Sequence, residues 1–154
     1  VLGHASRAFV ETSLDLRSTL ATVASEVGTV LGSTIIVSLV ETDGRIHTAA
    51  VHHPVPAARE LLQAIGQASP TQLGEGFTGT VVRTGQSLFI PSIDPAVVRE
   101  GVAPAYRTFL ERHPIYAAIA TPLRTRGRII GSIGATRNHP GETYTHADLQ
   151  LLQD

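Results

Sequence analysis

The residues of this chain best suited to chemistry are its seven histidines. His47, His52 and His53 lie in one apolar segment that is typical of a strand. On a strand His47 and His53 share a face, but six residues separate them by about 20 Å, too far to share a metal ion. No cluster of carboxylates accompanies them, so we interpret them as histidines at a solvent-exposed edge. His139 and His146, in or beside loops, receive the same interpretation.

Nucleophilic and covalent chemistry has little support in the composition. The chain has no Cys, and all twelve of its basic residues are Arg. Cysteine nucleophiles, thiolate metal sites, thioether-linked chromophores, lysine Schiff bases and a P-loop are therefore excluded. The sequence contains no G-x-S-x-G, no H-E-x-x-H and no segment of paired carboxylates. We expect no catalytic activity from this chain.

A literal G-x-G-x-x-G occurs at Gly74, Gly76 and Gly79, with Asp94 twenty residues after the first glycine. A dinucleotide-binding fingerprint follows a buried strand and opens a β-α-β unit, whereas turn residues precede this one. We interpret it as a glycine turn that leads into a short helix over Thr78–Thr84. Asp94 then caps a loop.

Length and charge indicate one globular domain. The 154 residues are 42% hydrophobic, with a net charge of −1. No basic block and no span of about 18 apolar residues is present, so we expect no contact with nucleic acid or membrane and a cytoplasmic location. The chain does not begin with Met, and it stops inside an apolar pattern after Thr145-x-x-Asp148, a capping box. We expect a module of a longer protein whose C-terminal helix is truncated.

The elements are arranged around a hairpin with strands over 117–123 and 128–136. Both faces of this hairpin are apolar or small, as in a central strand pair covered on both sides. Gly131, Gly134 and the alanines leave room for a helix or a ligand. A capping box at Thr12 predicts a helix over 12–32, ended by Gly32. The remaining expected elements are an incoming linker helix over 1–11, strands over 34–41, 46–52 and 86–91, and helices over 57–67 and 105–112. This order predicts an α+β domain over 12–154.

Three segments together resemble the GAF domain family. They are LGEGFTGTVVRTGQSLFIPSID (Leu73–Asp94), IATPLRTRGRIIGSIGATR (Ile119–Arg137) and YTHADLQLL (Tyr144–Leu152). Their order and spacing carry the resemblance, which covers residues 12–154. It implies a PAS-related antiparallel sheet with the terminal helices packed on one face. Shorter helices and loops form a cavity on the other face.

The resemblance implies a sensory, small-molecule-binding domain of a multidomain bacterial signalling protein, most often a histidine kinase. The terminal helices would form a homodimer and carry the signal to an effector domain in the same polypeptide. The alternative is a ligand-free dimerisation module with a filled core. Branches of the family that attach a bilin or reduce methionine sulfoxide use Cys, which this chain lacks. The NKFDE-type motif of phosphodiesterase domains has no counterpart here, so cyclic-nucleotide binding loses support.

The segments that ring the cavity in this family supply the candidate ligand-binding residues. They are Phe77, Ile90, Asp94, Tyr106, Arg107, His113, Tyr116 and Thr121. Aromatic and apolar walls with a few hydroxyls and one Arg suit a small, anionic organic ligand, although core packing competes as an interpretation for each residue. Haem-binding members place an axial His just before the hairpin, where His113 stands, and a neutral imidazole suits haem iron. The alternative is a helix-terminal histidine that contacts carbonyl groups.

Overall fold

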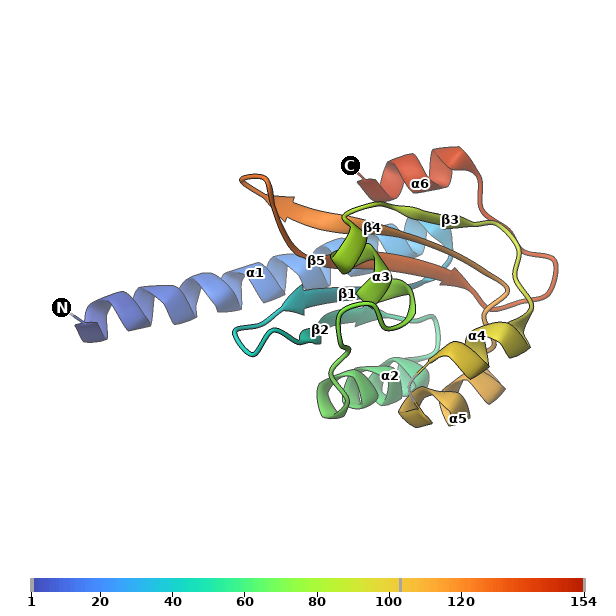
Figure 1. Cartoon of the computed structure of the whole chain (residues 1–154), viewed down its shortest axis with the longest axis horizontal. Coiled ribbons are helices and arrows are strands. Elements are labelled where there is room, and N and C mark those ends of the chain that lie inside the picture. Colours follow the sequence, from blue (N-terminus) through green and yellow to red (C-terminus); the bar gives the residue numbers. More distant parts are fainter. Residues whose placement is uncertain (1, 103, 154) are drawn as a thin grey trace.

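A computed structural model describes residues 2–102 and 104–153, with side chains from Leu16 onward (Figure 1). The elements in chain order are α1 (Leu2–Leu31), β1 (Thr34–Val40), β2 (Ile46–His52), α2 (Pro56–Ala68), α3 (Gly76–Thr84), β3 (Leu88–Ile90), α4 (Pro95–Gly101), α5 (Pro104–Arg112), β4 (Ala117–Thr125), β5 (Arg128–Arg137) and α6 (His146–Gln153). No helix in these described ranges has the length and apolar character needed to cross a bilayer.

The strands form one antiparallel sheet in the order β2-β1-β5-β4-β3. The β4–β5 hairpin turns through Arg126 and Gly127, whose φ angles of 53° and 77° match the mirror-image turns that suit the twist of a hairpin. β5 lies at the centre of the sheet, between β1 and β4. The predicted α+β class and the covered central hairpin are confirmed.

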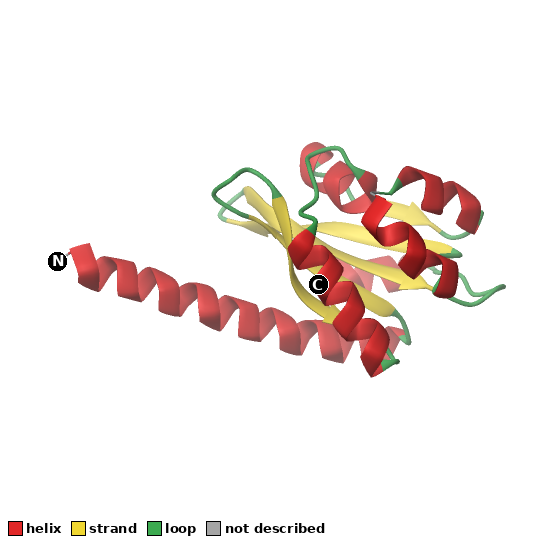
Figure 2. Cartoon of the chain, turned by 90° about the horizontal axis from the view of Figure 1, so that it is seen from below, coloured by secondary structure: helices red, strands yellow, loops and turns green. Residues whose placement is uncertain are grey.

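The terminal helices pack on one face of the sheet, as the resemblance implied. α1 lies against β1 and β2, and α6 lies against β4. The strand side chains beneath them are almost fully buried, with Ile35, Val37 and Ile119 at most 1% exposed. The N-terminal part of α1 extends beyond the sheet (Figures 1 and 2). We call this surface of the sheet the helix face.

The shorter helices cover the opposite face. α2 contacts β2, α3 contacts β4 and β5, and α5 contacts α2 and α4. Their buried side chains form a separate hydrophobic cluster that includes Leu62 of α2, Val98 of α4 and Phe109 of α5. Figure 1 shows α2, α4 and α5 grouped on the side of the sheet away from α6. We call this surface the cavity face.

A β-bulge in β2 decides which of its residues meet the cavity. Val37 pairs with Ala50 and Ser38 pairs with Thr48, so Ala49 is the extra residue. Ala50 therefore packs on the helix face, while Thr48 joins Ser38 on the cavity face. The same shift places His47 and His53 on opposite faces. The expectation that they share a face is wrong, because regular alternation stops at the bulge.

Two details of the predicted helices are corrected. α1 runs without a break from Leu2 to Leu31, so no helix begins at Thr12; a capping box forms only where the preceding backbone is non-helical. Residues 95–101 form a short helix, α4, that the sequence did not predict. Gly32, with φ 62°, ends α1 as expected. The second capping box is also confirmed, since the Thr145 and Asp148 side chains each accept the other's backbone N–H.

Candidate ligand-binding site

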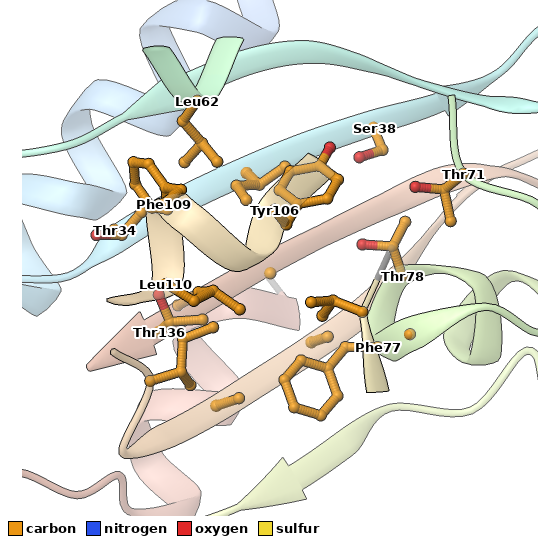
Figure 3. A pocket seen from close by; sticks show the side chains of 18 of the residues that line it. Thr34, Ser38, Leu62, Thr71, Phe77, Thr78, Tyr106, Phe109, Leu110 and Thr136 are labelled. Atoms are coloured by element: carbon orange, nitrogen blue, oxygen red, sulfur yellow. The ribbon is translucent and has the colours of Figure 1, made fainter. Parts of the chain in front are cut away.

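A cavity of about 140 Å³ lies between the cavity face of the sheet and helices α2, α3 and α5 (Figure 3). Its floor is made of small residues on the two central strands, namely Ala118 and Ala120 of β4 and Gly134 of β5. Strand β1 adds Thr34, Ile36 and Ser38, which share one face by the two-residue period of a strand. The space left by the small residues of the hairpin therefore holds a cavity.

One end of the cavity is rich in hydroxyl groups. The side chains of Ser38, Thr71, Thr78 and Tyr106 come from four separate segments, and their oxygens gather at the same end (Figure 3). Burial raises the pKa of Tyr106 above its ordinary value, and the nearby Thr48 side chain offsets part of this shift. Tyr106 is therefore a neutral phenol at any physiological pH. This end offers both donors and acceptors.

The other end is mostly apolar. Leu62, Phe109 and Leu110 gather there from α2 and α5, beside Thr34 and Thr136, and Phe77 of α3 lies apart from them, below Thr78 (Figure 3). Phe109 and Leu110 are buried, with 5% and 6% of their surface exposed, and the Thr34 hydroxyl already donates to Asn138. Flat aromatic and branched aliphatic walls of this kind favour an apolar or aromatic group. The cavity thus combines a hydroxyl-rich end with a mostly apolar one.

Among the described residues the lining contains one carboxylate, Glu75, one histidine, His113, and no Arg. Arg107, the predicted cationic partner of a ligand, is exposed on α5 and does not line the cavity. The reason is helical spacing, since Tyr106 faces inward and its immediate neighbour points elsewhere. The prediction of an anionic ligand therefore loses the Arg on which it rested. An anion entering this cavity would be desolvated without an Arg to pair with.

A histidine cluster closes one side of the site. His113 lines the cavity, and its ring centroid lies 4.9 Å from Phe109 and 4.8 Å from His53. His53 is only 6% exposed, so its interpretation as a solvent-edge residue is wrong. The His53 Nδ1 accepts the Val55 N–H at 3.0 Å, which leaves the proton of the neutral ring on Nε2. That Nε2 is buried without a partner among the described residues.

The pKa of His53 falls from its ordinary 6.5 to about 4. Burial is the main cause, followed by the charges of His113 and His52. The ring is therefore neutral near pH 7. Because the described residues contain no group of three or more possible metal ligands, the histidine cluster gives no metal centre.

Haem does not fit this site. The cavity volume of about 140 Å³ is well below the roughly 300 Å³ at which pockets for drug-sized ligands begin. The ring of His113 is also packed between Phe109 and His53 rather than presented to an open space. We therefore derive no chemistry through haem. His113 belongs to the cavity wall.

Three of the predicted ligand-binding residues line the cavity: Phe77, Tyr106 and His113. Thr121 does not, because it lies on the helix face, where its hydroxyl accepts a hydrogen bond from Ser87 at 2.9 Å. The prediction rested on its place in the hairpin, but strand alternation puts Thr121 on the same side as Ile119. Whether any of these residues binds a ligand remains a prediction.

The other predicted residues also lie outside the cavity lining. The Asp94 carboxylate caps α4 by accepting the Ala96 N–H at 3.0 Å, which is the structural role weighed for it. Ile90 pairs with Ala118 at the edge of the sheet. Tyr116 is half-buried, and its N–H donates to the Arg137 carbonyl at 2.9 Å. Arg107 completes this group.

Sequence reasoning missed the hydroxyl-rich end. The signal on β1 was present, since Thr34 and Ser38 share a face with Ile36 in an otherwise apolar strand. Thr71 and Thr78 gave no such signal. Thr71 forms an isolated antiparallel bridge with Ile46, and Thr78 lies at the start of α3. The approach of both residues to β1 depends on tertiary packing.

An antiparallel sheet with helices at both chain ends on one face and an amphipathic cavity on the other is typical of small regulatory domains that bind small molecules. The GAF domain family model matches residues 15–154, and the chain belongs to this family. GAF domains are in general small-molecule-binding regulatory or sensory domains. Comparison with curated proteins gives no significant match.

Several solved structures share the fold. The GAF domain/HD domain protein from Geobacter sulfurreducens has a TM-score of 0.70 at 14% identity, covering 93% of this chain and 88% of that chain. Type II free methionine-R-sulfoxide reductase from Thermoplasma acidophilum has a TM-score of 0.63 at 13% identity, covering 91% and 86%. NreA from Staphylococcus aureus, mutated in its nitrate binding site, has a TM-score of 0.61 at 14% identity, covering 86% and 93%. At these identities the likeness concerns the fold alone.

Proposed function

We propose that this GAF domain is the sensory module of a multidomain bacterial signalling protein, such as a histidine kinase of a two-component system. A small molecule binds in the cavity, and the terminal helices carry the response to an effector. One observation carries the proposal. The cavity and the terminal helices lie on opposite faces of the same central strands, so a change on one face reaches the other through a single layer.

The end of β5 supplies a route from the cavity to the helices. Thr136 lines the cavity, and the next residue, Arg137, donates hydrogen bonds to the backbone carbonyls of Leu31 and Thr143. The guanidinium also lies 4.4 Å from the centre of the Tyr144 ring. These partners stand at the end of α1 and just before α6. A shift of β5 on ligand binding therefore acts on both helices together.

Tyr144 strengthens the same junction. Its hydroxyl and the Ser33 hydroxyl are 2.8 Å apart, and both side chains are buried. Burial raises the pKa of Tyr144 to about 12, so the phenol keeps its proton at physiological pH. The hydrogen bond between the end of α1 and the start of α6 therefore does not change with pH in the physiological range. Ligand binding, not protonation of this pair, is the signal that we propose.

We propose a homodimer formed through α1 and α6, located in the cytoplasm, without catalytic activity of this domain itself. α1 has 30 residues, about 45 Å at the ordinary helical rise, and much of it extends beyond the sheet (Figure 2). The absence of Cys argues against cysteine-dependent reduction of methionine sulfoxide. The absence of Arg from the described part of the lining argues against nitrate.

Native mass spectrometry of the protein as purified tests this proposal. We expect a retained small molecule that dissociates on activation, or tight binding of one from a cell extract, together with a dimeric mass. A protein that retains and binds nothing would instead support the ligand-free dimerisation module. A strict monomer in analytical ultracentrifugation, even for a longer chain that includes the neighbouring segments, would remove the proposed role of α1 and α6.

A further inference from the structure

We infer that the cavity selects a small, uncharged, amphipathic molecule: an aromatic or branched group carrying one hydroxyl, of the size of phenol. This inference rests on the proposed function, because it names the class of ligand for the same cavity. It is argued from the volume, the charge and the polarity of the lining. Each of these limits the ligand independently.

The volume limits the size of the ligand. The cavity measures about 140 Å³, close to the roughly 150 Å³ of an apolar protein cavity that accepts benzene. A ligand of about six to eight non-hydrogen atoms therefore fits without rearrangement of the walls. Nucleotides and tetrapyrroles are far larger. The floor of Ala118, Ala120 and Gly134 has no side chain that could move aside to admit them.

The charge of the lining disfavours ionised ligands. Among the described residues no Arg lines the cavity, and His113, a lining side chain that can become cationic, is packed against Phe109 and His53. An anion would therefore lose its hydration without gaining the ion pair that an Arg supplies. The Glu75 carboxylate would repel an anion further. A cation gains little from Glu75, because this side chain is half-exposed and its Oε2 already accepts the Gln72 N–H at 3.4 Å. A neutral molecule avoids both the desolvation of a charge and the repulsion by Glu75.

The two ends of the cavity define the orientation of such a molecule. Ser38, Thr71 and Thr78 present hydroxyls at one end, and their side chains make no hydrogen bond to another side chain within the described ranges (Figure 3). A ligand hydroxyl placed there can donate to one and accept from another. The ring then lies toward Phe109 and Leu110 at the mostly apolar end, where aromatic contact is favoured (Figure 3).

A titration with four probes that share a six-membered ring tests this inference. The ¹H–¹⁵N spectrum of the whole chain would be recorded with phenol, benzene, benzoate and benzylammonium. We expect phenol to shift the amides of β1, α3 and β5 around the cavity. Its dissociation constant should be about tenfold lower than that of benzene, which lacks the hydroxyl. Benzoate and benzylammonium should bind at least tenfold more weakly than phenol.

Matched variants locate the contact. Ser38→Ala and Thr78→Val each remove one hydroxyl from the polar end and should weaken phenol about three- to tenfold while leaving benzene unchanged. Ser87→Ala, which removes a half-buried hydroxyl on the helix face, should change neither. Gly134→Val places a side chain in the cavity and should abolish both. If Gly134→Val does not fold, the two hydroxyl variants still decide the question.

The outcomes separate this inference from the proposed function. A charged probe that binds the same amides more tightly than phenol overturns the neutral ligand class but keeps a ligand-binding cavity. The absence of any cavity shift with all four probes also overturns the inference. In that case the native mass spectrum decides the proposed function on its own, since a retained molecule of another class would preserve it.

Discussion

The two faces of the central strands are built from neighbouring residues but packed in opposite ways. On the helix face, Ile35, Val37 and Ile119 are large, branched and at most 1% exposed. On the cavity face the same strands carry Ser38, Gly134 and other small or hydroxylated residues. Successive residues of these strands point to opposite faces of the sheet, so each strand contributes to both. The helix face is tightly packed and stabilises the fold, whereas the cavity face is packed less tightly and leaves a cavity.

The stability lost by leaving this cavity unfilled can be bounded. At about 24 cal/mol per Å³ of unfilled volume, a closed cavity of about 140 Å³ would cost on the order of 3 kcal/mol relative to a filled core, which is an upper bound for a cavity that is partly open to solvent. A chain that served only to hold its fold would gain by placing larger side chains at Gly134 and Ala120. The difference between the faces is therefore the physical reason to assign function to the cavity face.

Adjacent residues on β1 give the strongest test of this contrast. Ile35→Ala deletes a fully buried side chain on the helix face and should lower the free energy of unfolding by about 4 kcal/mol. Ile36→Ala deletes the same atoms beside an existing cavity, where the side chain is already partly exposed, and should cost about 1–2 kcal/mol. Urea denaturation followed by circular dichroism measures both values.

Each variant of this pair serves as the control for the other, because strand propensity and the deleted volume are the same. Equal losses would show that the cavity face is packed as tightly as the helix face. A larger loss for Ile36→Ala would reverse the comparison entirely.

Lowering the pH should destabilise the fold mainly through the cavity face, where His53 is buried. His53 is neutral in the folded protein because its pKa is lowered to about 4, against 6.5 when unfolded. Between these values the unfolded chain binds more protons, so stability is present above pH 6.5 and is lost as pH falls toward 4. The loss should reach at most about 3 kcal/mol. His53→Asn, whose side-chain oxygen can accept the Val55 N–H, should flatten this part of the profile.

The free energy of unfolding from urea titrations at pH 7, 6, 5 and 4 provides the measurement. His139→Asn is the control, since His139 is exposed in a loop and should leave the profile unchanged. If the wild-type and His53→Asn profiles stay parallel from pH 7 to pH 4, burial of a neutral His53 is not the cause of acid sensitivity.

Loss of the hydrogen bonds that join the end of β5 to the two terminal helices should lower the free energy of unfolding less than Ile35→Ala or the fall in pH does. Arg137→Gln removes the hydrogen bonds to the C-terminal end of α1 and to the segment before α6. It also removes the guanidinium from above the Tyr144 ring. Because these groups are partly exposed, we expect a loss of about 2 kcal/mol. Arg124→Gln, which removes an exposed arginine bonded to the Gly85 carbonyl, should cost less than about 1 kcal/mol. Equal losses would mean that Arg137 is an ordinary surface residue.

The helix face was the predictable part of the molecule. The hairpin over 117–136, the strand pair before it and the capping box at Thr145 follow from local rules of alternation, turns and caps. These rules act within a few residues, so a single sequence displays them. The segments that resemble the GAF family then predicted the antiparallel sheet and the placement of the terminal helices, but not the order of the strands within the sheet.

The cavity face was predictable only in outline. Phe77, Tyr106 and His113 were expected there, whereas Thr121 was assigned to the wrong face. Its lining draws on five or more separate segments, and the bulge at Ala49 reverses the facing of β2 without any glycine or proline to announce it. The burial of His53 follows from the placement of α5, which no local pattern specifies. A site whose residues meet only through tertiary packing cannot be predicted from local sequence patterns.

Two glycines three residues apart on β5 give the finest comparison, and Gly134 gives the smallest expected effect. A Cβ added at Gly134 would meet Ala120 and the Ile119 carbonyl at 3.8 Å, an ordinary contact in free space. Gly134→Ala should therefore change the free energy of unfolding by less than about 1 kcal/mol, and the reduced freedom of the unfolded chain favours stabilisation. Thermal denaturation detects a change of this size.

Gly131→Ala is the counterpart, because its Cβ would come within 1.9 Å of the Ser38 carbonyl oxygen, in the backbone of the paired strand. Backbone atoms of a central strand cannot move aside, so this variant should lose several kcal/mol by overpacking. A tolerated Gly131→Ala beside a damaging Gly134→Ala would mean that the free space lies elsewhere on β5. With the expected order, β5 is closely packed against β1 at one end and open toward the cavity at the other, which is what a strand that relays ligand binding to Arg137 requires.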